Sequence, residues 1–147
     1  MNTRSFFIIA ALCLVFIQTV LADIYSQLQF IKIVSPKNGQ DIEAGKPLVV
    51  KYVMQPLIVN HVAAGRALKL NVNFHKRTGN AKEQKLAIIH KSCPVAAKEN
   101  KYVTYTKKWT VPKGTKPGSY AVDFVELVQL RRGQITVKET VKVNVVE

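Results

Sequence analysis

Three histidines, His61, His75 and His90, are the side chains of this sequence best suited to hold a transition metal, because neutral imidazole is a common metal ligand. None of them stands in a His-x-His or His-x3-His spacing, and no Cys-x2-Cys pair is present. His75 and His90 would face each other only if the strands that carry them pair. The pattern therefore predicts no metal site and no cofactor.

Pairs of carboxylates are the second candidate chemistry, since glycoside hydrolysis uses two carboxyl groups about 5 to 10 Å apart. Asp123 and Glu126 are three residues apart in a segment typical of a strand, so their side chains should point to opposite faces. Asp41 and Glu43 could share a face, but they lie in a turn-rich segment. The sequence also lacks a nucleophile-elbow motif. We therefore predict a protein without catalytic activity and keep a carbohydrate-active or metal-binding enzyme as an alternative.

Cations with interleaved aromatic rings occur in KENKYVTYTKKW, residues 98–109. Such a pattern suits charged or sugar ligands, because lysines bind anionic groups and ring faces stack on apolar ones. Alternation along a strand places Tyr105, Lys107 and Trp109 on one face and Lys108 on the other. We expect Trp109 to pack inward, which leaves the opposite face of this strand, with Lys108, exposed to solvent.

The overall charge points to the same class of ligand. Lys and Arg number 22 against 9 Asp and Glu, a formal net charge of +13. Such an excess favours polyanionic partners through long-range attraction, although it also serves solubility alone. We expect anionic polysaccharide rather than nucleic acid as the partner, held by a basic face whose candidate residues are Lys69, Lys107, Lys108, Lys113, Lys116, Lys138 and Lys142.

The first 22 residues have the pattern of a secretory signal peptide. Arg4 precedes an apolar run from Phe6 to Ile17, and Val20 and Ala22 supply small side chains at positions −3 and −1 of a cleavage site before Asp23. Residues 23–147 then form a single domain, which we expect to be secreted to the extracellular space or cell wall and to have no membrane span.

Cys93 is the cysteine that remains after such a cleavage, because Cys13 lies in the signal peptide. A single cysteine in a secreted chain is a buried thiol, a reactive thiol or a bridge to another chain. The surrounding KSCPV segment has no catalytic signature. The sequence leaves the three roles of Cys93, and the oligomeric state, open.

The elements that must position these residues are strands. Short apolar or alternating runs separated by Gly, Pro and Asn predict strands at 29–34, 47–54, 67–76, 85–91, 101–111, 119–130 and 135–146. About seven antiparallel strands without a helical period predict an all-β, Ig-like or fibronectin-like β-sandwich. Glu139 falls on the apolar face of the last strand, which indicates a bulge or a sheet edge.

The stretch WTVPKGTKPGSY, residues 109–120, joins two of these strands. We expect Trp109 and Val111 to close the first strand inward and Pro112 to Gly118 to turn the chain. Tyr120 is expected to reach back toward this turn, as corner tyrosines do in sandwiches. Lys113 and Lys116 are then displayed on a loop stiffened by proline.

Two segments resemble a known family. IKIVSPKNGQDIEAGKPLVVKY, residues 31–52, resembles the opening of the Ig-like N-terminal domain of fungal cell-wall synthesis proteins, the killer-toxin-resistance group linked to β-1,6-glucan assembly. WTVPKGTKPGSYAVDF, residues 109–124, is similar to a later segment of that domain. The resemblance implies an Ig-like fold and a secreted, cell-wall-associated protein. It is carried by Ser35, Pro36, Gly39, Ala44, Gly45, Trp109, Pro112, Gly118 and Tyr120.

The sequence thus predicts a secreted, non-catalytic β-sandwich that binds anionic polysaccharide of a cell wall or matrix through a basic face. The main alternative is a cationic effector that acts on foreign membranes or host factors. That alternative would require leakage of anionic vesicles, and the sequence has no strongly basic amphipathic helix that would cause it.

Overall fold

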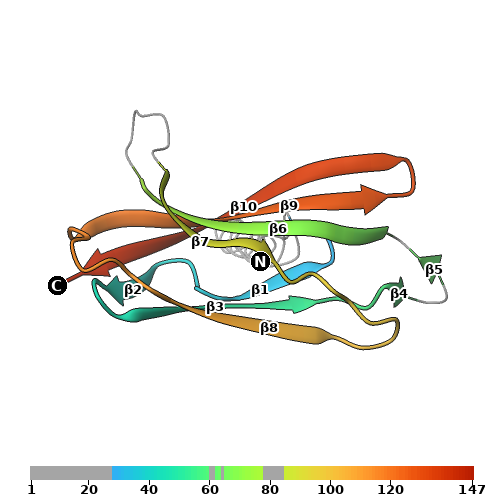
Figure 1. The fold of residues 1–147 in the computed structure, drawn as a ribbon, viewed down its shortest axis with the longest axis horizontal. Coiled ribbons are helices and arrows are strands. Elements are labelled where there is room, and N and C mark those ends of the chain that lie inside the picture. The colour runs from blue at the N-terminus through green and yellow to red at the C-terminus, as the bar shows by residue number, and fades with distance from the viewer. Residues whose placement is uncertain (1–27, 60–61, 64, 78–84) are drawn as a thin grey trace, which may run out of the picture.

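The computed structural model describes residues 28–147 except 60–61, 64 and 78–84. In this part of the chain a three-stranded and a five-stranded sheet pack face to face, and a small hairpin of β4 (Ile58–Val59) and β5 (Val62–Ala63) lies apart from them (Figure 1). The predicted all-β, Ig-like or fibronectin-like sandwich is confirmed.

The three-stranded sheet has the order β1-β3-β8, and both of its pairings are antiparallel. Its central strand alternates strictly, with Leu48, Val50, Tyr52 and Met54 all at 2% exposure or less. This period of two is that of a strand with one face in a core. The strands are β1 (Ile31–Ser35), β3 (Pro47–Met54) and β8 (Val103–Thr110).

The five-stranded sheet has the order β2-β10-β9-β6-β7 and covers the other side of the core. Its inward positions carry Leu70, Val72, Phe74 and Phe124, which are at 0 to 1% exposure. All pairings are antiparallel except that of β2 with β10. The strands are β2 (Gln40–Glu43), β6 (Gly65–Lys76), β7 (Lys85–Cys93), β9 (Gly118–Leu130) and β10 (Gly133–Val146).

The two sheets hold eight strands in the described residues, where the sequence predicts about seven. The additional strand is β2, within a segment that we predicted to be a turn-rich connection. It pairs in parallel with the end of β10, so that Ile42 lies opposite Val145 and is buried. A four-residue strand whose partner is about a hundred residues away has no recognisable pattern in the neighbouring sequence. The expectation of antiparallel strands is wrong for the pairing of β2 with β10.

Glu139 faces inward on β10, as its position on the apolar face of that strand predicts. It pairs with Phe124 in a stretch of β9 and β10 whose register is continuous, without a bulge. The pairing with β2 is confined to Val143–Val146, so Glu139 lies beyond it. Of the two explanations that we considered, the structure favours the sheet edge.

Two of the expectations concern residues outside this description. The signal peptide, residues 1–22, and His61 are not among the described residues, so the structure does not test them. Within residues 28–147 and apart from the gaps given above, no helix is long and apolar enough to cross a membrane.

Candidate functional site

A loop between β8 and β9, residues 111–117, closes one end of the sandwich. Val111 is fully buried, its N–H donates to the carbonyl of Lys46 at 3.0 Å, and its own carbonyl accepts from the N–H of Gly45 at 2.8 Å. Within the loop, the N–H of Thr115 donates to the carbonyl of Pro112 at 3.0 Å. The loop is therefore held against the turn between β2 and β3 and is also turned by its own backbone.

Tyr120 fixes the other end of this loop. Its ring is 3% exposed, and its hydroxyl donates to the carbonyl of Lys116 at 2.8 Å. The predicted reach of Tyr120 back to the turn is thus confirmed. Gly45, in the turn between β2 and β3, lies close to the loop residue Lys113. Its φ is 79°, and a Cβ at this position would lie 3.2 Å from Cγ of Lys113. A side chain at this position would be strained and would press on the loop.

Aromatic rings support the loop from beneath. The rings of Phe74 and Tyr120 are stacked, with centroids 5.1 Å apart and planes 2° apart, and Trp109 meets Phe74 at the same distance with a tilt of 55°. Trp109 is half-buried against the core, which confirms its predicted inward orientation. Such ring pairs add to the stability gained by burial alone, so they stabilise the two strand ends, at Trp109 and Tyr120, that the loop connects.

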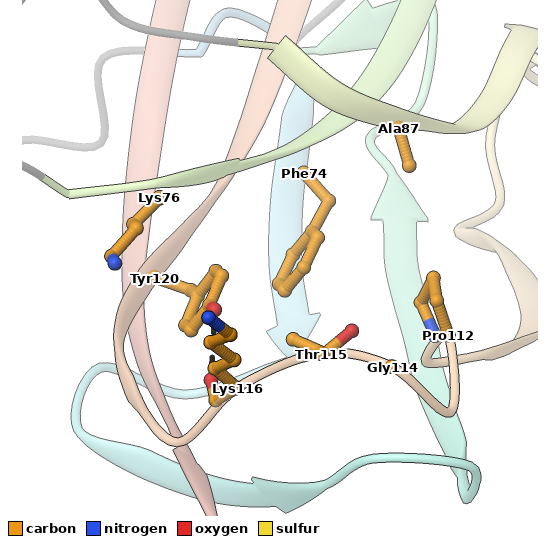
Figure 2. A pocket seen from close by; sticks show the side chains of 8 residues that line it. All are labelled: Phe74, Lys76, Ala87, Pro112, Gly114, Thr115, Lys116 and Tyr120. Atoms are coloured by element: carbon orange, nitrogen blue, oxygen red, sulfur yellow. Dashed lines mark hydrogen bonds between the residues drawn. The ribbon is translucent and has the colours of Figure 1, made fainter.

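A pocket of about 370 Å³ lies between this loop and the edge of the five-stranded sheet (Figure 2). The apolar part of its wall comes from Phe74 on β6, Ala87 on β7, Pro112 in the loop and Tyr120 on β9. Thr115 adds a hydroxyl. The described residues of the lining are Phe74, Lys76, Ala87, Pro112, Gly114, Thr115, Lys116 and Tyr120.

Two cations stand at this pocket. Lys76 comes from the end of β6 and Lys116 from the loop, and their side chains lie around the ring of Tyr120 (Figure 2). Among the described residues of the lining there is no Asp or Glu. The described part of the pocket therefore combines an apolar wall with two positive charges and no carboxylate, which suits a small ring that carries an anionic group.

The seven candidate lysines do not share one face. Lys113 and Lys116 belong to the loop at the pocket, whereas Lys108 points outward from the three-stranded sheet. Lys69, Lys138 and Lys142 belong to the five-stranded sheet, at positions that alternate with its inward residues, and so they lie on the opposite side of the sandwich. The structure thus brings one loop lysine, Lys116, together with Lys76, which the sequence did not single out.

Lys107 occupies an inward position on β8 but remains exposed at the sheet edge, where it lines a second, smaller pocket of about 60 Å³.

Cys93 also lines this smaller pocket. It is 4% exposed, and its Sγ lies 3.6 Å from the carbonyl oxygen of His90. Burial raises the pKa of the Cys93 thiol to about 11. A protonated, buried thiol is a poor nucleophile, so the structure favours the buried-thiol role over a reactive thiol or a bridge to another chain.

His75, Asp123 and Thr140 form a polar cluster that sequence reasoning missed. Thr140 Oγ1 donates to Asp123 Oδ1 at 2.6 Å, and His75 Nε2 lies 2.9 Å from Asp123 Oδ2 without the alignment of a hydrogen bond. His75 Nδ1 lies 3.1 Å from the carbonyl oxygen of Lys76. The hydroxyl contacts the carboxylate and not the imidazole, so the order of contacts differs from that of a Ser-His-Asp triad. The cluster is a structural network across β6, β9 and β10.

The remaining catalytic candidates stay separate. Strands β6 and β7 pair, but their register places His90 opposite Val72, so His90 and His75 do not face each other. Asp123 points outward from β9 and Glu126 points into the core, as predicted from their spacing. Among the described residues no group of three or more His, Cys, Asp or Glu side chains could hold a metal ion.

Comparison with known proteins adds likenesses in fold only. No protein-family model matches the chain, and no curated protein matches it. Among solved structures, the fibronectin(III)-like modules of CbhA from Clostridium thermocellum match with 23% identity and a TM-score of 0.39, over 78% of this chain and 93% of that one. A Niemann-Pick type C2 protein from the Japanese carpenter ant matches with 11% identity and a TM-score of 0.44, over 80% and 90%. Superoxide reductase (neelaredoxin) from Ignicoccus hospitalis matches with 18% identity and a TM-score of 0.39, over 78% and 80%.

Proposed function

We propose that this protein is a secreted, non-catalytic β-sandwich that binds acidic sugar residues of cell-wall or extracellular polysaccharide in the pocket beside the β8–β9 loop. The observation that carries the proposal is the combination of Lys76 and Lys116 with an apolar wall that contains Tyr120, in a lining whose described residues include no Asp or Glu. The described residues of the pocket supply no acid and base pair, which favours binding as its function.

An acidic sugar matches this pocket in shape and in chemistry. One side of a pyranose ring presents C–H groups, which pack on apolar and aromatic walls, and a carboxylate or sulfate at the ring edge is a partner for the ammonium groups of Lys76 and Lys116. Thr115 offers a hydroxyl to the sugar hydroxyls. A volume of about 370 Å³ lies at the low end of the range for small-molecule sites, which favours one or two sugar residues.

The charge of the whole chain supports the same ligand class. A net charge of +13 attracts polyanions over distances longer than a contact. This attraction is screened at physiological ionic strength beyond about 8 Å. Affinity should therefore fall as salt is added, and the pocket should supply the selectivity that charge alone cannot.

Secretion and association with a cell wall are parts of the proposal that rest on the sequence. The pattern of residues 1–22 supports export, and the resemblance to the Ig-like domain of fungal cell-wall synthesis proteins supports a fungal cell-wall setting. The resemblance involves Trp109, Pro112, Gly118 and Tyr120, which build and flank the loop that forms the pocket.

The experiment that tests the proposal compares galacturonic acid with galactose, its uncharged counterpart. Binding is measured by NMR chemical-shift titration at low and high salt. We expect galacturonic acid to bind and galactose to bind at least about tenfold more weakly, a difference of about 1.4 kcal/mol. The double variant K76Q/K116Q should lose this selectivity, while the matched control K69Q/K142Q, with the same loss of charge on the outer face of the five-stranded sheet, should keep it.

Two results would contradict the proposal. Equal binding of the two sugars, or binding of galacturonic acid that resists high salt, would exclude charge recognition in the pocket. Leakage of anionic vesicles at the concentrations that bind the sugar would instead favour the alternative of a cationic effector that acts on membranes.

A further inference from the structure

The outer face of the three-stranded sheet carries three lysines, one on each strand. Lys32 is on β1, Lys51 on β3 and Lys108 on β8, and each follows or precedes residues whose side chains enter the core, such as Ile31 and Tyr52. Since side chains alternate along a strand, the three lysines point away from the core. Lys32 and Lys108 are exposed, and Lys51 is partly exposed.

The register of the sheet aligns these lysines in a diagonal row. Lys32 lies opposite Val53, which is two residues from Lys51 in one direction along β3. Lys108 lies opposite Val49, which is two residues from Lys51 in the other direction. Diagonal neighbours of this kind are about 7 to 8 Å apart, so the row extends over roughly 15 Å. We call it the lysine row.

The three strands that carry the lysine row contribute no carboxylate to it. The strands β1, β3 and β8 contain no Asp or Glu, and the acidic residues of the described strands are confined to the five-stranded sheet. The other outward positions around the row are threonines and valines, among them Val49, Thr104 and Thr106. The three strands therefore contribute only positive charge to this face.

The row leads toward the pocket. From Lys32 through Lys51 to Lys108 it advances toward the end of the sheet where Pro47 pairs with Thr110. Beyond Thr110 the chain enters the loop, in which Pro112 lines the pocket and Lys116 supplies a cation. Pro112 is the fourth residue after Lys108, a distance of about 13 Å for an extended chain. This distance is comparable to the length of the row itself.

We propose that the lysine row and the pocket form one binding track, in which a linear acidic polysaccharide lies across the three-stranded sheet and places its terminal sugar in the pocket. The inference rests on the proposed function and adds to it the form of the ligand, an extended chain bound by its end. The row contributes mainly electrostatic contacts, and the pocket recognises the terminal residue.

A length series tests the track. Galacturonic acid and its oligomers of about four and about eight residues are titrated against the full chain, against the row variant K32Q/K51Q/K108Q, and against the control K69Q/K138Q/K142Q. The control removes the same number of charges from the five-stranded sheet. Thermal unfolding of all three proteins verifies that each one folds.

For the unmodified protein we expect affinity to rise at least about tenfold from the monomer to the longest oligomer. The row variant should bind the monomer as the unmodified protein does and lose most of this gain. The control should keep both the monomer affinity and the gain. The gain should also shrink as salt is raised, since exposed ion pairs are screened.

Different results would contradict the proposed binding track and the proposed sugar binding in the pocket. Binding of the monomer without a gain for longer oligomers, or an equal loss of the gain in the row variant and the control, would overturn the track and leave the proposed function intact. Absence of monomer binding by the unmodified protein would overturn the proposed function, and with it the placement of the chain end in the pocket.

Discussion

Strand β9 carries two buried carboxyl groups, Asp123 on the outer face of the five-stranded sheet and Glu126 on the inner face, and their surroundings differ. On the outer face, Asp123 accepts a hydrogen bond from Thr140 and lies against His75. On the inner face, Glu126 is 0% exposed and accepts a hydrogen bond at Oε2 from the backbone N–H of Gln29 at 2.9 Å. Its Oε1 has no hydrogen-bond partner among the described residues.

The surroundings explain the difference. The cross-strand neighbours of Glu126 are Leu70 on β6 and Val137 on β10, so the carboxyl group sits among apolar side chains. Burial raises its pKa to about 7, and the hydrogen bond from Gln29 opposes this shift only in part. The comparison shows that two carboxyl groups on one strand have different surroundings, with polar partners beside Asp123 and apolar neighbours around Glu126.

The largest effect is expected from removal of the outer carboxylate. Asp123→Ala should lower the free energy of unfolding by about 2 to 3 kcal/mol, because it leaves buried His75 and the hydroxyl of Thr140 without their partner. Urea denaturation at neutral pH measures this loss. Asp41→Ala, which removes an exposed carboxylate from β2, serves as the control and should change stability by less than about 0.5 kcal/mol. Similar losses in the two variants would show that the cluster is not stabilising.

A pH-dependent effect is expected at the inner carboxyl group. Glu126 has a raised pKa, so between its ordinary value of 4.5 and about 7 the folded protein retains a proton that the unfolded chain has released. The protonated Glu126 carboxyl group therefore makes its full contribution to the free energy of unfolding below pH 4.5, and this contribution is lost as the pH rises through 7. Glu126→Gln should remove this dependence and gain about 1 to 2 kcal/mol relative to the native chain between pH 4.5 and pH 8.

Unfolding curves at several pH values measure this gain, and the difference between pH values is independent of any constant packing cost of the substitution. Glu99→Gln, at an exposed position, is the matched control and should not alter the pH profile in the same direction. A Glu126→Gln profile parallel to that of the native chain would show that the buried carboxyl group does not titrate in this range.

The smallest effect is expected at Thr140, which touches Asp123 from a more exposed position. Thr140→Val keeps the size and the β-branched shape of the side chain and removes one hydrogen bond, so a loss of about 0.5 to 1 kcal/mol is expected. The double variant with Asp123→Ala should lose less than the two single losses together, since the two residues share one interaction. Simple additivity would mean that the hydroxyl and the carboxylate act independently.

Much of the fold could be predicted because its signals are local. The alternation of Leu48, Val50 and Tyr52 locates β3, and that of Val141, Val143 and Val145 locates the end of β10. The position of Tyr120 after a proline-containing turn predicted its contact with the loop. The strand that was missed, β2, and the parallel pairing that it makes depend on a partner far along the chain, which no local pattern encodes.

The candidate site was predictable only in part. Lys113 and Lys116 were assigned to a displayed loop, but the pocket also needs Lys76 and Phe74 from β6 and Ala87 from β7. The lysine row depends on the register of three strands, because Lys32, Lys51 and Lys108 become neighbours only when β1, β3 and β8 pair. The sequence placed Lys108 with lysines that the structure locates on the opposite side of the sandwich.

The sequence by itself determined the class of fold, the inward orientation of Trp109, the opposite orientations of Asp123 and Glu126, and a strong positive charge. These follow from the period of two along a strand and from composition, which act within a few residues. Only the tertiary structure decided which charges gather and which are neutralised. Strand order and register bring together residues from distant segments, and electrostatic and hydrogen-bond energies depend on those distances rather than on separation along the chain.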